Sequence, residues 1–169
     1  IILMLSLMVQ PMLAQGQKNS RRNDNYTPTK EGTPGYYDKT VRHLFRQGLW
    51  GTGKKLLDEG LSKYETLSAL NELMGSYWLH YKKYDKARYF LIRSLRDDNK
   101  NPQTLQMLMK VEEMTKHYSS ALVYCNQLLE LAPYEYTLWR KKIELYRLQG
   151  NNVEAIKSDW ERYILSAKR

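Results

Sequence analysis

The sequence predicts an all-α fold in which about four antiparallel helix-turn-helix units stack on one another. Ala87 and Ala121 lie 34 residues apart (121 minus 87), and each follows an aromatic and two polar residues and precedes an apolar run. A fixed period of this length is typical of helical repeat arrays, whose neighbouring units bury each other's apolar faces. The composition agrees, because the chain has 9 glycines and 5 prolines and lacks the Val, Ile and Thr alternation that indicates strands.

The repeat fills the chain from about residue 34 to its end, because one further period on either side reaches Gly53 and Ala155. Each unit is expected to contain a first helix, a tight turn and a second helix. Gly48 and Gly150 are expected to end first helices in the left-handed conformation, which glycine adopts without strain. The predicted units are residues 34–67, 68–101, 102–135 and 136–169.

Glycine, large aromatic residues and proline recur at defined places in these units. The second unit reads Met74-Gly75-Ser76-Tyr77-Trp78, the fourth carries Trp139 and Tyr146, and Pro133 ends the third. These positions resemble the W-x2-L-G-x2-Y first-helix pattern and the closing proline of the tetratricopeptide repeat (TPR) family. The resemblance covers about four-fifths of the chain. It implies a right-handed solenoid whose first helices line a concave groove.

The second helices also follow the TPR pattern, which places a small residue four positions before a large one. A small side chain lets the two helices of a pair approach closely. The matching pairs are Gly53 with Leu57, Ala87 with Leu91, and Ala121 with Cys125.

Four polar residues depart from the TPR pattern. Asn71, Glu112 and Lys142 occupy first-helix positions that are usually apolar, and Asp159 replaces a large apolar residue in the fourth unit. The last helix keeps one apolar stripe, so the fourth unit is expected to be degenerate but helical. No polar capping helix follows this stripe, which predicts partly uncovered apolar side chains and a sequence that continues in a longer protein. The stripe comprises Ile156, Trp160, Tyr163 and Ile164, with Leu165 beside it.

The chain has 14 tyrosines and one cysteine. By register, Tyr37, Tyr84, Tyr118 and Tyr146 fall at contacts between helices, so they are expected to pack in the interior rather than to stack on bases or sugars. Cys125 has no partner for a disulfide within the chain and is expected to be a small buried hydrophobe.

The N-terminal segment predicts export. Residues 1–13 are almost uninterruptedly apolar and are followed by Ala14 and Gln15, which resembles the core and cleavage site of a signal peptide within residues 1–14. The segment is too short for a membrane-spanning helix, which needs about 20 apolar residues. We expect cleavage and a periplasmic or outer-membrane-associated protein, with an uncleaved anchor as the alternative. Residues 15–33 are polar and aperiodic and are predicted to be a disordered linker.

The net charge of +9 raises the possibility of nucleic-acid binding. The cations of the second unit, however, alternate with Asp85, Asp97 and Asp98, and most fall on the second helix, which lies on the outer side of such arrays. A solvated outer face explains this pattern better, so nucleic acid is not the expected partner. The cations are Lys82, Lys83, Lys86, Arg88, Arg93 and Arg96.

No catalytic, cofactor or metal site is predicted. His43, His80 and His117 occupy different positions in the repeat, so stacking does not bring them to one point. None belongs to a zinc-binding spacing, and no nucleophile elbow or phosphate-binding loop occurs.

The TPR resemblance implies a binding groove lined by first-helix residues. Polar and apolar side chains alternate there, which suits an extended or helical peptide anchored on Phe45, Leu79, Met114 and Leu148. Part of this surface is expected to be ordinary solvated helix. The candidate groove residues are Asp38, Arg42, Phe45, Arg46, Glu72, Ser76, Leu79, His80, Gln103, Gln106, Lys110, Glu113, Met114, Arg140, Glu144, Arg147 and Leu148.

One known TPR ligand is not expected. The carboxylate clamp for chaperone tails resembles Lys and Asn in one unit, Asn in the next, and Lys and Arg further on. Here these places hold Asp38 and Arg42, then Leu73, then Gln103 and Met107. The predicted function is therefore an exported scaffold that holds another protein or peptide partner. The alternatives are an N-terminal assembly module of a larger outer-membrane or secretion-system protein and, less favoured, a basic nucleic-acid-binding repeat protein.

Overall fold

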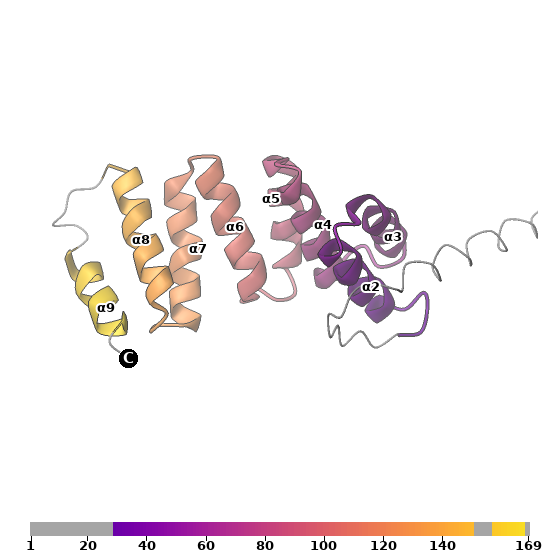
Figure 1. Ribbon diagram of the computed structural model, residues 1–169, viewed down its shortest axis with the longest axis horizontal. Coiled ribbons are helices and arrows are strands. Elements are labelled where there is room, and N and C mark those ends of the chain that lie inside the picture. The colour runs from indigo at the N-terminus through magenta and orange to yellow at the C-terminus, as the bar shows by residue number, and fades with distance from the viewer. Residues whose placement is uncertain (1–28, 151–156, 168–169) are drawn as a thin grey trace, which may run out of the picture.

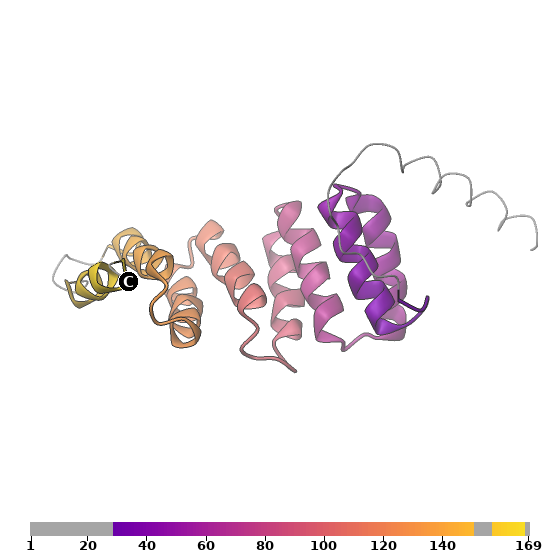
Figure 2. The same ribbon diagram turned by 60° about the horizontal axis from the view of Figure 1, so that its bottom comes forward.

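The computed structural model describes residues 29–150 and 157–167, and these form an elongated stack of helices (Figures 1 and 2). Consecutive helices pack as antiparallel pairs, and the pairs follow one another along the stack from α2 and α3 to α8 and α9. The predicted all-α solenoid is confirmed. The helices are α2 (Pro34–Arg46), α3 (Trp50–Lys63), α4 (Ser68–His80), α5 (Tyr84–Ser94), α6 (Pro102–Met114), α7 (Tyr118–Leu131), α8 (Tyr136–Leu148) and α9 (Lys157–Ala167).

Side chains cap the first helix of three of the four pairs, and the exception is α4, which begins after Leu67 without such a cap. Thr33 and Asn101 accept hydrogen bonds from the backbone N–H groups of Tyr36 and Thr104, and each is followed by a proline at the first helical position. The side chain of Glu135 caps α8 in the same way. These caps satisfy backbone donors that have no partner within the helix.

A residue with positive φ ends each first helix, at an interval of one repeat. Gly48 and Gly150 have φ values of +77° and +87°, as predicted, and Lys82 and Lys116 occupy the equivalent turns at +56° and +63°. The residue after Lys82 donates its N–H to the Trp78 carbonyl, five residues earlier, which closes the helix end. The repeat therefore imposes the left-handed conformation even where the residue is lysine.

Glycine permits the closest approach within the second pair. A Cβ atom on Gly75 would lie 2.5 Å from the Cδ2 atom of Leu91, which is fully buried on α5. Ala87, one turn earlier on α5, is also fully buried, as the small-then-large pattern predicted. The two helices can pack at this distance only while residue 75 lacks a side chain.

Three apolar clusters form the core, and each joins two neighbouring units, as expected for an array in which no unit is stable alone. The predicted tyrosines pack in or against these clusters, and Cys125 is fully buried. In chain order, the clusters include Tyr37, Leu57 and Leu70; Ala87, Leu91 and Leu108; and Ala121, Cys125 and Leu138.

Two of the polar departures are buried with partners of their own. The Asn71 amide donates to the carbonyl oxygens of Glu65 and Leu67 at 2.8 and 3.0 Å. Glu112 accepts a hydrogen bond from Arg88 Nε at 2.6 Å. These hydrogen bonds offset the cost of burying the Asn71 amide nitrogen and the Glu112 carboxylate, whereas the buried Oδ1 atom of Asn71 has no hydrogen-bond partner among the described residues.

Several predictions fall wholly or partly outside the described residues. The signal segment 1–14, its cleavage site, residues 15–28 of the expected linker and Ile156 are among them. Residues 29–33 form a turn in which the Gly32 carbonyl accepts a hydrogen bond from the Tyr64 hydroxyl at 3.1 Å. Among the helices that the structure describes, none has the length and apolar composition to cross a membrane. On α9, Tyr163 packs against the core, whereas Ile164 and Leu165 are exposed.

Candidate functional site

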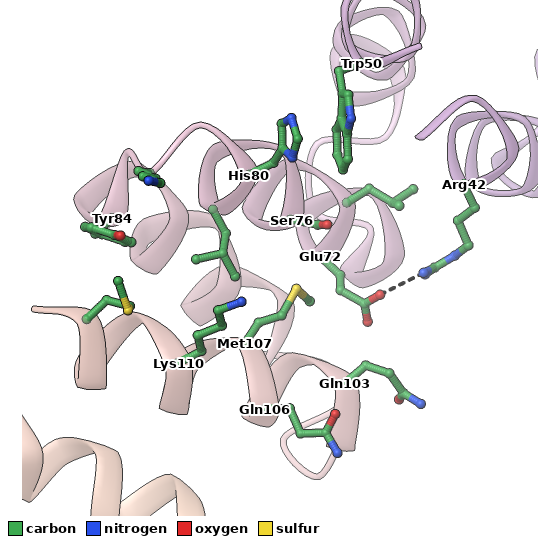
Figure 3. Close-up of a pocket in the computed structure, with 14 residues that line it drawn as sticks. Arg42, Trp50, Glu72, Ser76, His80, Tyr84, Gln103, Gln106, Met107 and Lys110 are labelled. Atoms are coloured by element: carbon green, nitrogen blue, oxygen red, sulfur yellow. Dashed lines mark ion pairs between the residues drawn. The ribbon is translucent and has the colours of Figure 1, made fainter. Parts of the chain in front are cut away.

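A groove of about 780 Å³ lies across the first helices α2, α4 and α6 (Figure 3). Glu72, Ser76 and His80 follow one another at intervals of four residues, so they lie on one face of α4. Gln103, Met107 and Lys110 share the facing side of α6 by the same geometry. The lining residues are Arg42, Trp50, Glu72, Leu73, Ser76, Leu79, His80, Lys82, Tyr84, Gln103, Gln106, Met107, Lys110 and Met114.

A second hollow of about 520 Å³ extends this groove toward α2. It shares Arg42, Trp50, Leu73 and Ser76 with the larger one and adds Phe45 and Arg46. The two hollows together offer a continuous channel across three units. Because this channel spans the first helices of three units, it suits a chain segment rather than a single small molecule.

The ion pair between Arg42 and Glu72 lines the groove and connects to hydroxyl groups that line neither hollow. Arg42 Nη1 lies 2.9 Å from Glu72 Oε1, and the Thr104 hydroxyl donates to Glu72 Oε2 at 3.2 Å. The Thr104 oxygen lies 3.2 Å from that of Ser94, which lies 3.2 Å from that of Ser68. These contacts connect the first three units through side chains that are mostly buried.

Two rings that line the groove, those of Trp50 and His80, are stacked on each other. The ring of Trp50 lies 3.9 Å from that of His80, at an interplanar angle of 11°, and 4.5 Å from that of Phe45. Phe45 is only 8% exposed and belongs to the core, so its expected role as an exposed apolar anchor is wrong.

Solved structures of similar shape support the repeat assignment. A crystal structure of MamA superposes with a TM-score of 0.72 at 14% identity, over 80% of this chain and 74% of that one. A structure of MamA AMB-1 superposes with a TM-score of 0.70 at 17% identity, over 85% of this chain and 83% of that one. MamA is an all-helical TPR-like solenoid. This chain has a TPR fold. No protein-family model matches it, and no curated protein matches it significantly.

In this TPR fold, the expected groove residues of α2, α4 and α6 mostly come together. Arg42, Glu72, Ser76, Leu79, His80, Gln103, Gln106, Lys110 and Met114 line the main groove, and Phe45 and Arg46 line its extension. Glu72 is only 5% exposed and already bonded to Arg42 and Thr104, so it holds the TPR units together instead of offering a free carboxylate.

The candidate residues of the fourth TPR unit, together with Asp38 and Glu113, do not line either hollow. Lys141 Nζ pairs with Glu113 of α6 at 3.0 Å and with Glu144 of α8 at 2.9 Å, so these two carboxylates are occupied. Asp38 is likewise paired with Arg42 at 2.7 Å. None of these carboxylates lines either hollow, nor do Arg140, Arg147 and Leu148.

The sequence interpretation did not include five lining residues among the candidates: Trp50, Leu73, Lys82, Tyr84 and Met107. Trp50 and Tyr84 begin the second helices of their TPR units and lie 34 residues apart. An aromatic residue at the same place in two units was therefore an available signal. All three equivalent residues pack against the core, but Tyr118 of the third unit lines neither hollow, so register alone does not decide which aromatic residue reaches the groove.

The groove offers hydrogen-bond donors and apolar surface. Gln103, Gln106 and Lys110 are exposed, and none forms a side-chain hydrogen bond within the described ranges 29–150 and 157–167. Within those ranges, no group of three His, Cys, Asp or Glu side chains could hold a metal ion. The pKa of the Cys125 thiol is raised to about 11, chiefly by burial, so this thiol is protonated near neutral pH. The arrangement suits binding of a ligand through hydrogen bonds and apolar contacts.

Proposed function

We propose that this protein is a non-enzymatic scaffold whose TPR groove binds a segment of another protein. The observation that carries the proposal is the continuous channel across α2, α4 and α6, in which unpaired polar groups lie beside apolar side chains. Lys110 and Gln106 provide donors for a peptide backbone or side chains, and Leu79 and Met107 provide apolar contacts. Such alternation allows hydrogen bonds to orient a peptide and apolar anchors to supply affinity.

Peptide display against the purified protein tests this function. Met114 in the groove is 51% exposed, and Val123 on α7, which lines neither hollow, is 55% exposed. Met114→Ser should weaken binding of the selected peptides by about tenfold, because it removes an apolar contact from the site. The matched Val123→Ser variant should bind as the parent does. Peptides that bind both variants equally would place their site elsewhere and refute a groove function.

We further propose that the protein acts outside the cytoplasm. The support is the apolar stretch of residues 1–13 followed by Ala14. Fractionation of the producing cells, combined with N-terminal sequencing of the recovered protein, tests this. Recovery from the cytoplasm with residues 1–14 intact would contradict export.

A second candidate is an assembly module of a larger envelope protein. Ile164 and Leu165 on α9 are 47% and 65% exposed, and neighbouring exposed apolar side chains often mark a contact surface. If this second proposal is right, the partner binds to α9 and not to the groove. Leu165→Ser would then weaken the interaction, whereas Met114→Ser would not.

A further inference from the structure

We infer that the groove selects an acidic peptide segment in which an apolar side chain lies between carboxylates. This inference rests on the proposed function and adds the chemistry of the ligand. It follows from the balance of charges in the groove and from the apolar surface between them.

Among the residues that line the two hollows, the positive charges are not balanced. Glu72 is their one carboxylate, and it is buried against Arg42 and Thr104. Lys82 and Lys110 are exposed and have no ion-pair partner in the described part of the chain. Arg46 adds a third exposed cation in the extension toward α2. A ligand carboxylate would meet uncompensated positive charge and donors but no free acidic side chain.

Apolar surface lies between these cations. Leu73, which lines both hollows, and Leu79 lie on α4, whereas Met107 and Met114 lie on α6, with Met114 one turn after Lys110. Methionine side chains adapt to ligands of differing shape, which suits an aliphatic or aromatic anchor. The pattern of charge, apolar surface and charge therefore favours a peptide with acidic residues on either side of an apolar one.

The same surface is less suited to single-stranded nucleic acid. Binding of bases without sequence preference requires exposed aromatic faces on which they stack. Trp50 lines the groove, but its ring already stacks between Phe45 and His80. The one remaining aromatic ring of the lining is that of Tyr84, so the groove offers no row of free rings for successive bases.

Fluorescence anisotropy with labelled peptides tests the inference. Three matched sets of short fluorescein-labelled peptides would share leucine and serine positions and carry glutamate, glutamine or lysine at the remaining ones. The glutamate set should bind at least about tenfold more tightly than the glutamine set, and the lysine set should not bind. The affinity of the glutamate set should fall as the salt concentration rises.

Because the whole chain is basic, charge at the groove must be separated from net charge. Lys110→Glu in the groove and Lys55→Glu on α3 change the net charge equally, and Lys55 is exposed and lines neither hollow. Lys110→Glu should weaken binding of the glutamate set by about tenfold or more, whereas Lys55→Glu should have little effect. Circular dichroism of both variants checks that their folds are intact.

The outcomes distinguish this inference from the proposed function. If neutral or basic peptides bind best and still require Met114, the groove binds peptides but the charge inference is wrong. If both lysine variants weaken binding equally, the attraction is general and the inference is also wrong. Tighter binding of labelled oligouridine than of the glutamate peptides, with loss in Lys110→Glu, would assign the groove to nucleic acid. If no peptide binds in a Met114-dependent way, the proposed function itself fails.

Discussion

The ammonium group of Lys142 on α8 lies 3.1 Å from the Oδ1 atom of Asp159 on α9. Each residue replaces an apolar residue of the TPR pattern, and the side chains are only 13% and 10% exposed. The Lys142 ammonium also lies 5.1 Å from the centre of the Trp139 ring. The charges of the two polar residues therefore neutralise each other, and their ion pair joins the helices of the degenerate fourth unit.

This pair predicts non-additive effects on stability. Lys142→Leu or Asp159→Leu alone should lower the free energy of unfolding by about 2–3 kcal/mol, because each leaves a partly buried charge without its partner. The double variant should be more stable than either single variant, since it restores an apolar contact. A double-mutant cycle from urea unfolding measures the coupling. Additive losses would show that the two side chains do not interact.

Glu72 should be important for stability. Glu72 of the second unit contacts Arg42 of the first and Thr104 of the third. Because Glu72→Ala removes both contacts, it should lower the free energy of unfolding by about 2 kcal/mol. The control is Glu65→Ala, whose carboxylate pairs with Arg93 but is 74% exposed. That variant should leave the denaturation midpoint almost unchanged. An equal loss of stability in the two variants would contradict the importance of Glu72 for stability.

The turn at Lys116 predicts a stabilising substitution. Lys116 has a φ of +63°, which strains a residue with a Cβ atom, so Lys116→Gly should raise the free energy of unfolding by about 1 kcal/mol. The control is Lys55→Gly within α3, which should lower it by about 1 kcal/mol. Thermal denaturation followed by circular dichroism compares the two. A lower melting temperature for Lys116→Gly would contradict the strain.

Replacing Gly75 and Gly51 with alanine should change the stability of the protein in opposite directions. Gly75→Ala places a Cβ atom 2.5 Å from Leu91 Cδ2 and should destabilise by about 2 kcal/mol, because buried Leu91 has little room to move. Gly51 lies in α3 with no neighbouring atom within 4 Å of the added Cβ. Gly51→Ala should therefore stabilise by about 0.5–1 kcal/mol. Chemical denaturation of both variants provides the comparison.

The buried thiol predicts a loss of stability at high pH. Burial raises the pKa of Cys125 from its ordinary value of 9.0 to about 11. Between these values the unfolded chain loses the thiol proton while the folded chain keeps it, so this contribution to stability falls as pH rises from about 9 to 11. Cys125→Ala should show a shallower decline across that window, although its stability is lower throughout because of the cavity. An equal loss of stability in the parent and in Cys125→Ala across that window would contradict the raised pKa of Cys125.

The helix pairs and their turns followed from local patterns. The 34-residue period placed Gly48 and Gly150 at the helix ends, where the structure has positive φ. The turns at Lys82 and Lys116 were not predicted, because lysine carries no local preference for that conformation and only the shared register requires it. The TPR fold could be predicted because propensity, capping and apolar periodicity act over a few residues and agreed with one another.

Local sequence patterns were enough to predict repeated helix pairs and the faces of the first helices that could line a groove. Which of those residues are free to bind depends on the packing of the helices. Arg42 and Glu72 are paired with each other, Phe45 is buried and stacks on Trp50, and Glu113 and Glu144 are paired with Lys141. These outcomes depend on distances between residues far apart in the chain. Periodicity identifies a helix face, but only packing decides which charges and rings on that face already have partners.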